Sequence, residues 1–306
     1  METAATLTLN PTIDASYAVE RMVHTRKMRG LAENYDPGGG GINVARVLVR
    51  LGATARCHYL SGGATGAALD GLLDRHQLVR VRTPIAGETR IAAAVLDRES
   101  GKEYRIVPPG PAVTEPEWQA CLAALAQIRC RYLIASGSLP PGVPDDFYAR
   151  VAGVAAERGA KFVLDSSGRG LKGALAGGGV HLVKPSLGEL RQLTGAELAD
   201  EAAIAAAAMA LVDEGRAEVV AVTMGHEGAL IASAQGPLRL PAIPVQAASA
   251  VGAGDSFLAG MVFALSQGAD VADAAKLGLA AGTAAVLTPG TGLAHPADIH
   301  RLRALI

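Results

Sequence analysis

Residues 132–164 read YLIASGSLPPGVPDDFYARVAGVAAERGAKFVL, and this stretch decides the fold class. Short β-rich runs at 132–135 and 161–164 flank a segment at 146–158 whose apolar residues have helical spacing. Strand, helix, strand is the unit of a parallel sheet, because parallel neighbours need a long crossover connection that is usually a helix. The strand runs are continuously apolar, as expected when helices cover both faces of the sheet.

The same alternation extends over most of the chain. Further β-rich runs lie at 5–9, 181–183 and 219–222. Segments with helical spacing lie at 42–51, 64–75, 116–128, 187–194, 201–215, 254–266 and 271–287. We therefore predict an α/β protein with a mostly parallel sheet and helices on both faces. Since no repeat or linker interrupts the pattern, residues 1–306 are interpreted as one domain.

Two segments depart from this alternation. Residues 15–35 carry scattered charge with little helical period, and residues 88–107 read as a hairpin. In the hairpin, TRIAAAVLD and KEYRIV flank a turn at 99–101. The two segments either form a small β-sheet outside the main domain or are ordinary surface excursions, and periodicity alone leaves both readings open.

Composition narrows the class of protein. Half of the residues are apolar and 19% are charged, which is typical of a chain with a large core. Lys plus Arg number 28 and Asp plus Glu 29, so nothing in the net charge of −1 indicates nucleic acid or a membrane surface as a partner. Three cysteines without a CxxC pair indicate neither a disulfide framework nor a zinc site. With no signal-peptide pattern and no apolar stretch of membrane-spanning length, we expect a cytoplasmic protein.

The strongest functional motif is SAVGAGDS at 249–256, which opens an apolar helical run. Glycines before a helix allow a tight turn and expose backbone N–H groups, and a helix N-terminus favours negative charge. Such a cradle suits a phosphoryl group in transfer, and Asp255 within it can accept the proton of an attacking hydroxyl. The alternative is a helix start with the Asp as a cap.

Two motifs near the N-terminus indicate a site for a polar ligand. PGGGGINVAR at 37–46 allows close approach to the backbone, and Asn43 on the first helical turn offers both donor and acceptor. The motif lacks the GK[ST] ending of a Walker A loop. Asp14 follows the first strand, where open α/β sheets bind ligands, and can accept bonds from sugar hydroxyls. A turn or cap role is the alternative for Asp14.

Charged and glycine-rich features complete the candidate site. The irregular segments carry a candidate anion clamp of Lys27, Arg29, Arg90 and Arg105, although each is equally typical of solvated surface charge. KPSLGE at 184–189 and TMGHEGAL at 223–230 both follow strands, and the second offers a glycine turn for a nucleotide. Glu189 can order water around magnesium, which keeps several waters when it bridges phosphates.

Taken together, the motifs resemble the ribokinase-like PfkB family of sugar kinases, in its phosphofructokinase branch, over essentially the whole chain. They occur in the order NPTID, PGGGGINVAR, GSLP at 137–140, DSS at 165–167, KPS, TMGHEGAL and SAVGAGDS. The resemblance implies a ribokinase-like fold whose small β-sheet lid, residues 15–35 and 88–107, is also the surface of a homodimer. It implies ATP-dependent phosphorylation of D-fructose 6-phosphate to fructose 1,6-bisphosphate. Tagatose-6-phosphate kinase, 1-phosphofructokinase and a catalytically weak sugar-phosphate-binding regulator are the alternatives.

The resemblance also assigns roles to matching residues. Asp255 would be the catalytic base, beside an anion hole formed by the amides of Gly252, Ala253 and Gly254. The sugar would be held by Asp14, Gly38, Gly39 and Asn43, and its phosphate by Lys27, Arg90, Arg105 and Ser138. ATP would be bound by Lys184, Ser186, Thr223, Gly225 and Gly228, with magnesium held through water by Glu189. A potassium site would lie near Ser249, Val251, Ala285, Thr288, Gly290 and Gly292.

The chain departs from the family pattern at one position. Ser186 stands where the family usually has the Asn of an N-x-x-E motif, while Glu189 keeps its place. We expect the shorter side chain to weaken nucleotide or magnesium handling without changing the class of reaction. The resemblance does not fix which ketohexose phosphate is preferred, nor whether ATP acts as an allosteric inhibitor.

Overall fold

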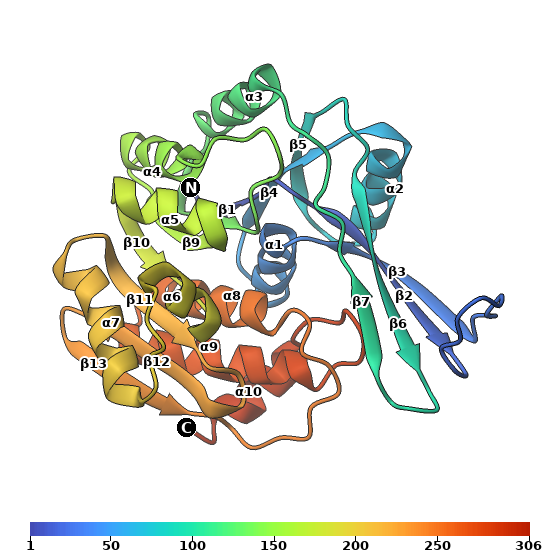
Figure 1. The fold of residues 1–306 in the computed structure, drawn as a ribbon. Coiled ribbons are helices and arrows are strands. Elements are labelled where there is room, and N and C mark those ends of the chain that lie inside the picture. The colour runs from blue at the N-terminus through green and yellow to red at the C-terminus, as the bar shows by residue number, and fades with distance from the viewer.

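A nine-stranded sheet forms the body of the molecule, in the order β13-β12-β11-β10-β9-β8-β1-β4-β5. The computed structural model describes all residues from 1 to 306 (Figure 1). The strands are β1 (Glu2–Thr8), β4 (Ala55–Ser61), β5 (Val79–Pro84), β8 (Cys130–Ser136), β9 (Lys161–Asp165), β10 (Val180–Val183), β11 (Ala217–Thr223), β12 (Gly228–Ser233) and β13 (Gly236–Pro241). Strand β12 pairs antiparallel with both β11 and β13, and every other pair in this sheet is parallel, which confirms the predicted mostly parallel sheet.

Helices cover both faces of this sheet. One face carries α3 (Glu115–Leu125), α4 (Phe147–Glu157), α5 (Gly168–Gly177), α6 (Leu187–Thr194) and α7 (Glu201–Asp213). The other carries α1 (Gly40–Arg50), α2 (Gly63–Leu73), α8 (Ala253–Ser266), α9 (Val271–Val286) and α10 (Pro296–Arg303). The two cores contain 39 and 38 buried residues, and successive strand residues such as Leu133 and Ile134 enter opposite cores. This explains why the strands read as continuous apolar runs.

Periodicity does not predict the short helix α10, nor does it predict helix α5. Its sequence, GRGLKGALAG, contains four glycines, which are poor helix formers. Gly173 packs so closely on the backbone carbonyl of Asp145 that a Cβ there would collide with it. Tertiary packing therefore determines this helix, and its composition conceals it.

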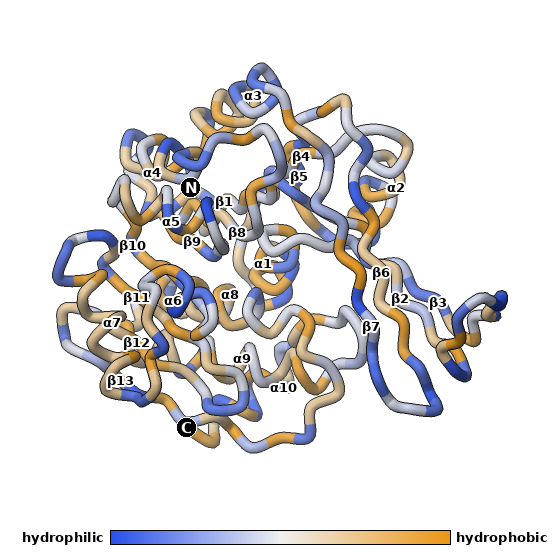
Figure 2. Tube along the Cα trace, in the orientation of Figure 1, coloured by the Kyte–Doolittle hydropathy of each residue, from blue (hydrophilic) through white to orange (hydrophobic).

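A second, four-stranded sheet projects from the body in the order β3-β2-β6-β7 (Figure 1). Its strands are β2 (Thr12–Val19), β3 (Ala32–Gly38), β6 (Arg90–Asp97) and β7 (Glu103–Ile106). Strands β6 and β7 form the predicted hairpin, and β2 joins the two irregular segments by pairing parallel to β6. The loops at the far end of this sheet are hydrophilic (Figure 2). Because β2 follows β1 directly, the small sheet begins where the large one ends.

No helix of the molecule has the length and apolar character needed to cross a membrane.

Candidate active site

The GAGD motif forms the start of helix α8. Gly252 has a φ of 72°, in the left-handed region that glycine adopts without strain, and a Cβ there would lie 2.5 Å from Leu293 Cδ2. The turn places Asp255 in the first turn of the helix, where its Oδ2 accepts a hydrogen bond of 2.9 Å from Asn43 Nδ2. The first amides of a helix have no intrahelical partner, so they can bind a phosphoryl oxygen beside this carboxylate.

Asp255 has the electrostatics of a general base. Burial raises its pKa to about 6, and the neighbouring charge of Asp165 raises it as well, whereas the bond from Asn43 and the charge of Lys184 lower it. A base works best when its pKa lies near the operating pH, because it is then ionised yet still basic. An ordinary, exposed Asp would be a weaker base.

A buried ion pair lies next to the start of α8. Lys184 Nζ, directly after β10, is 3.1 Å from Asp165 Oδ1 at the end of β9, and the two side chains are 5% and 14% exposed. Burial is the largest single influence and lowers the pKa of Lys184, but the charge and hydrogen bond of Asp165, together with the charges of Asp255 and Glu189, raise it overall, so the ammonium group persists. A Cβ on Gly254 would lie 3.2 Å from Lys184 Nζ, which places this cation at the helix start. Its position suits a phosphate held there.

Asp165 and Arg46 are site residues that motif reasoning missed. Arg46 is buried in helix α1, and its Nη1 donates to the Pro37 carbonyl at 3.1 Å and to Asn43 Oδ1 at 3.3 Å. This second bond orients the amide of Asn43 so that its Nδ2 faces Asp255. The available signals were a carboxylate at a strand end and an arginine three residues after Asn43, on the same face of a helix.

Replacing Arg46 by Met is expected to lower kcat/KM roughly tenfold or more, because the amide that holds Asp255 is no longer oriented. Asp255 accepts a proton only when ionised, so activity falls as pH drops through its pKa of about 6. Loss of the Asn43 bond, which lowers that pKa, moves the acid limb of the kcat/KM profile to higher pH. The matched control is Arg50→Met, one turn along α1, whose side chain bonds the carbonyls of Leu293 and Ala294 instead. An acid limb that stays in place in Arg46→Met would contradict this role.

Asp14 lies in strand β2 beside the glycine loop. Burial raises its pKa to about 6, while the charges of Arg105 and Arg90 oppose the shift. A Cβ on Gly38 would collide with the Asp14 carboxylate, and Gly39 has a φ of 116°, so these two positions require glycine. The loop therefore brings its backbone against Asp14 and leads directly into α1 and Asn43.

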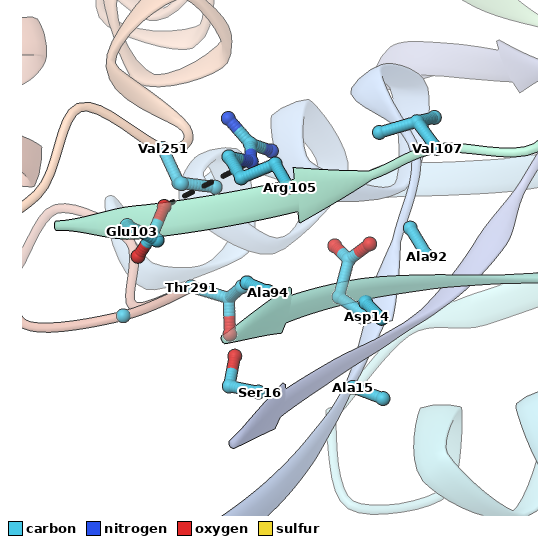
Figure 3. Close-up of a pocket in the computed structure, with 12 residues that line it drawn as sticks. Asp14, Ala15, Ser16, Ala92, Ala94, Glu103, Arg105, Val107, Val251 and Thr291 are labelled. Atoms are coloured by element: carbon cyan, nitrogen blue, oxygen red, sulfur yellow. Dashed lines mark ion pairs between the residues drawn. The ribbon is translucent and has the colours of Figure 1, made fainter. Parts of the chain in front are cut away.

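A cavity of about 20 Å³ lies between the small sheet and the body. Figure 3 shows Asp14 and Arg105 lining it together with Val251 and Thr291, and Arg105 pairs with Glu103 along the same strand. A volume of this size holds about one water molecule. The cavity as it stands is therefore too small for a hexose phosphate.

Arg90, Asn10 and Ser138 meet where the two sheets join. Arg90 donates to the carbonyls of Asn10 at 2.8 Å and Pro108 at 2.9 Å, and Asn10 Nδ2 donates to Ser138 Oγ at 3.4 Å. Arg90 Nε and Asn10 Oδ1 are buried without a partner. Because buried polar atoms are rarely left unpaired, these two atoms mark a place where a polar ligand fits.

Lys27 is the predicted residue that stands apart. It is exposed, makes no ion pair, and belongs to the loop between β2 and β3 at the far end of the small sheet (Figure 1). Within one chain the structure does not bring it to Asp14, Arg90 and Arg105.

The predicted nucleotide residues lie side by side. Ser186 and Thr223 form a parallel β-bridge, and the amide of Thr223 donates to the Pro185 carbonyl at 3.0 Å. The glycine turn follows, with a φ of 59° at Gly225 and 101° at Gly228.

Ser186 caps helix α6 in a capping box with Glu189. Ser186 Oγ accepts from the Glu189 amide at 3.2 Å, and a Glu189 carboxylate oxygen accepts from the Ser186 amide at 2.7 Å. Serine thus retains the helix-capping function that an asparagine would serve at this position. The carboxylate of Glu189 is held in place at the same time.

The predicted potassium residues also converge. Ser249 Oγ donates to the Gly290 carbonyl at 2.7 Å and accepts from the Val251 amide at 3.2 Å, while the Thr288 amide bonds the Ala285 carbonyl at 3.0 Å. Gly292 lies beside Gly252, since its carbonyl would be 3.8 Å from a Cβ there. The loop between α9 and α10 therefore packs against the segment that leads into the GAGD turn.

These features define a phosphotransferase with an alcohol acceptor. A buried base lies at a helix-start anion cradle, a cation adjoins it, and Asp14 lies close to the charges of Arg90 and Arg105 at a small cavity of the same site. The chain belongs to the pfkB family of carbohydrate kinases, whose family model matches residues 7–298. It is a sugar-phosphate kinase of that family, and such a kinase uses ATP.

Two kinds of relative support this assignment. The chain is 43% identical to the ATP-dependent 6-phosphofructokinase isozyme 2 of Mycobacterium tuberculosis, over 97% of this chain and 87% of that protein. The crystal structure of phosphofructokinase-2 from Escherichia coli in complex with potassium superimposes with a TM-score of 0.95 at 36% identity, covering 100% of this chain and 99% of the other. The same enzyme in complex with fructose-6-phosphate gives a TM-score of 0.93 at 35% identity, with the same coverage.

Proposed function

We propose that this kinase transfers the γ-phosphoryl group of ATP to the C1 hydroxyl of D-fructose 6-phosphate, giving fructose 1,6-bisphosphate and ADP. The observation that carries the proposal is the closeness of Arg90 and Arg105 to Asp14, a carboxylate whose charge in turn acts on the base Asp255. A free sugar offers no partner for these cations. The relatives named 6-phosphofructokinase, one of them solved with fructose-6-phosphate, support the same substrate.

The reaction needs one proton acceptor and a fixed geometry. Asp255 takes the proton of the C1 hydroxyl as its oxygen forms a bond to the γ-phosphorus and the bond from that phosphorus to the β-phosphate oxygen breaks. The amides of Gly252, Ala253 and Gly254 stabilise the negative charge on the transferred group. Lys184, which lies at the same helix start, stabilises the phosphates, and Asp165 helps to keep it protonated and in position.

Two metal ions fit residues of this site. The fixed carboxylate of Glu189 near the nucleotide segments suits magnesium held through water, which would neutralise the charge of the ATP phosphates. The backbone carbonyls of the loop at 285–292, with Ser249 and Val251, are hard oxygen ligands of the kind that suit potassium. The neighbour solved with potassium supports this second ion.

The small sheet acts as a lid in this proposal. Residues 1–306 form one kinase domain, and the segments 15–35 and 88–107 form the lid. Asp14, Gly38, Gly39 and Asn43 hold the sugar, and Arg90, Arg105 and Ser138 hold its phosphate. Closure over the substrate would exclude water from the transfer, which limits wasteful hydrolysis of ATP.

Arg90→Ala is expected to raise the KM for fructose 6-phosphate roughly ten- to a hundredfold and leave the KM for ATP nearly unchanged, because a charge-assisted bond to the sugar's phosphate is lost. Steady-state kinetics with each substrate varied in turn provide the measurement. Arg82→Ala is the control, since that arginine pairs with Asp70 on the body instead. A raised ATP KM with an unchanged sugar KM would show that the two subsites are exchanged.

The outer face of the lid supports a homodimer. Its exposed apolar side chains are Tyr35, Ile91, Tyr104 and Ile106, which are 40%, 44%, 42% and 64% exposed. They alternate along the strands with the residues that line the cavity, so this face points away from the site. In a dimer through this face, the loop that bears Lys27 would lie near the partner's site.

Sedimentation equilibrium is expected to show a dimer that Ile106→Asp dissociates, because a buried charge without a partner opposes association. Val79→Asp, at an exposed apolar position of β5 on the body, is the control and should leave the dimer intact. A monomeric wild type, or a dimer that Ile106→Asp leaves intact, would rule out the lid as the interface.

An ADP-release assay on a panel of sugar phosphates tests the proposed function. Fructose 6-phosphate is expected to have the highest kcat/KM. A preference for tagatose 6-phosphate or fructose 1-phosphate would keep the reaction class and change the substrate. Binding without ADP release would indicate a regulator rather than an enzyme.

A further inference from the structure

The loop between β8 and α4, residues 137–146, carries Ser138 to the junction of the two sheets. Asn10 Nδ2 donates to Ser138 Oγ, and the Asn10 carbonyl accepts from Arg90, so Ser138 lies beside residues proposed to bind the phosphate of the sugar. The loop forms no helix or strand, and its prolines at 140, 141 and 144 lack backbone N–H groups with which it could bond itself. Its shape therefore depends on side chains from other elements.

Arg169, at the start of helix α5, binds the backbone of this loop after Ser138. Its Nη1 donates to the Val143 carbonyl at 2.6 Å, and its Nη2 donates to the carbonyls of Pro140 at 2.7 Å and Leu139 at 3.5 Å. Asp145 Oδ1 lies 2.7 Å from the same Nη1 and neutralises the guanidinium group. The planar fork of arginine bridges several oxygens at once, which the single ammonium group of a lysine cannot do in the same geometry.

The residue before Ser138 is fixed as well. The Gly137 carbonyl accepts a bond of 2.8 Å from the Tyr148 hydroxyl and one of 3.0 Å from Ser166 Oγ. Ser138 is thus held between two anchored segments of backbone. Its own hydroxyl takes part only in the long bond of 3.4 Å from Asn10, so its hydrogen is free to donate to a ligand.

We propose that Arg169 positions Ser138 for the phosphate group of the sugar, and in this way contributes to the preference for a phosphorylated substrate. The inference rests on the proposed function. Arg169 acts through the loop and not by its charge, because Asp145 neutralises it and its other bonds go to backbone carbonyls. Without the guanidinium fork the backbone after Ser138 loses two short hydrogen bonds, and the hydroxyl is no longer held where the phosphate binds.

Arg169→Met is expected to raise the KM for fructose 6-phosphate roughly tenfold and to leave kcat/KM for fructose within about twofold, because only the phosphate meets Ser138. Steady-state kinetics with the two sugars measure this split. Arg150→Met is the matched control, since that side chain pairs with Asp146 and lies over the Trp118 ring instead of bonding the loop carbonyls. Equal losses for the two sugars would make Arg169 a purely structural residue and overturn the proposal.

A double-variant cycle tests whether Arg169 acts through Ser138. Ser138→Ala alone should lower kcat/KM for fructose 6-phosphate roughly tenfold, since a bond to a charged group is lost. In that background Arg169→Met should lower it by less than about twofold more, because two changes to one interaction do not add. Losses that multiply in full would show that Arg169 acts elsewhere.

Hydrogen exchange requires no sugar and so separates this inference from the proposed function. The amides of residues 137–143 should exchange faster in Arg169→Met than in the wild type, and at the wild-type rate in Arg150→Met. If Arg169→Met does not fold, Asp145→Ala, which removes an exposed carboxylate from Arg169, should show the same changes to a smaller extent. Unchanged exchange in the variant that folds would refute the proposal, whichever sugar the wild type prefers. A wild type without preference for fructose 6-phosphate over fructose, but with the expected exchange, would contradict the proposed function and leave Arg169 as the residue that holds the loop.

Discussion

Asp255→Asn lowers kcat by roughly 10²–10⁴-fold and leaves the KM values for both substrates within a few-fold of wild type. The asparagine has the same shape, so the hydrogen bond to Asn43 can re-form through its amide oxygen. It cannot accept the proton of the sugar hydroxyl, and only that step is lost. Stopped assays with high enzyme concentration measure the residual rate.

The melting temperature of Asp255→Asn shows whether a loss of activity comes from the missing base or from a loss of folding. The pKa of Asp255 is raised in the folded state, so its contribution to stability is present at low pH and is lost as pH rises from the ordinary value of 3.8 to about 6. Above that window the ionised carboxylate destabilises the fold, and Asn removes the charge. The melting temperature at neutral pH should therefore not fall. Asp298→Asn, in the first turn of exposed helix α10, is the matched control and should retain full activity. A kcat of Asp255→Asn equal to that of the wild type would contradict the assignment of Asp255 as the general base.

The wild-type enzyme is expected to use fructose 6-phosphate at least about a hundredfold better than fructose in kcat/KM, since two charge-assisted interactions are each worth about 1.5–3 kcal/mol. Without a phosphate, Arg90 and Arg105 lie near Asp14 but lack a ligand that neutralises them if the small sheet closes over the sugar as proposed. Closing unpaired cations over a neutral sugar costs desolvation free energy. The phosphate removes that cost and aligns the C1 hydroxyl with Asp255.

Ionic strength provides an independent check that Arg90 and Arg105 bind the phosphate of the sugar. Added salt screens the attraction between a dianionic substrate and its cations, so the KM for fructose 6-phosphate should rise with salt. The Arg90→Ala, Arg105→Ala double variant should lose most of the preference over fructose. Comparable kcat/KM values for the two sugars in the wild type would instead place the chain among kinases of free sugars.

The large sheet and its helices could be predicted because the β-rich runs and the helical spacing of apolar residues agree with the secondary structure of the folded molecule. Segments such as 271–287 have helical spacing from end to end, and α9 occupies them almost completely. Helix α5 could not be predicted in this way, because its glycines serve contacts with α4 that exist only in the folded molecule. The sequence leaves two readings of the small sheet open, because the parallel pairing of β2 with β6 joins residues far apart in sequence.

The residues of the site also divide into those that the sequence predicts and those that only the folded structure reveals. Asp255 and Asn43 each lie in a local glycine motif, so both could be singled out, but their hydrogen bond spans 212 positions and only the fold reveals it. Arg46 and Asp165 lie within the motifs PGGGGINVAR and DSS, but they act through neighbouring side chains, so their roles appear only in the folded structure. Lys27 is the opposite case, a residue that the sequence predicted for the phosphate site and that the structure places elsewhere. Its charge suggested a role in binding phosphate, but within one chain it lies outside the cavity.

One measurement tests the central claim most directly: ³¹P NMR of a reaction that contains only this protein, magnesium, ATP and fructose 6-phosphate. The account predicts that ATP is converted to ADP in step with a new phosphomonoester signal at C1 of the sugar, while the 6-phosphate signal persists as part of the bisphosphate. Release of inorganic phosphate without a bisphosphate, or an unchanged spectrum, would contradict it.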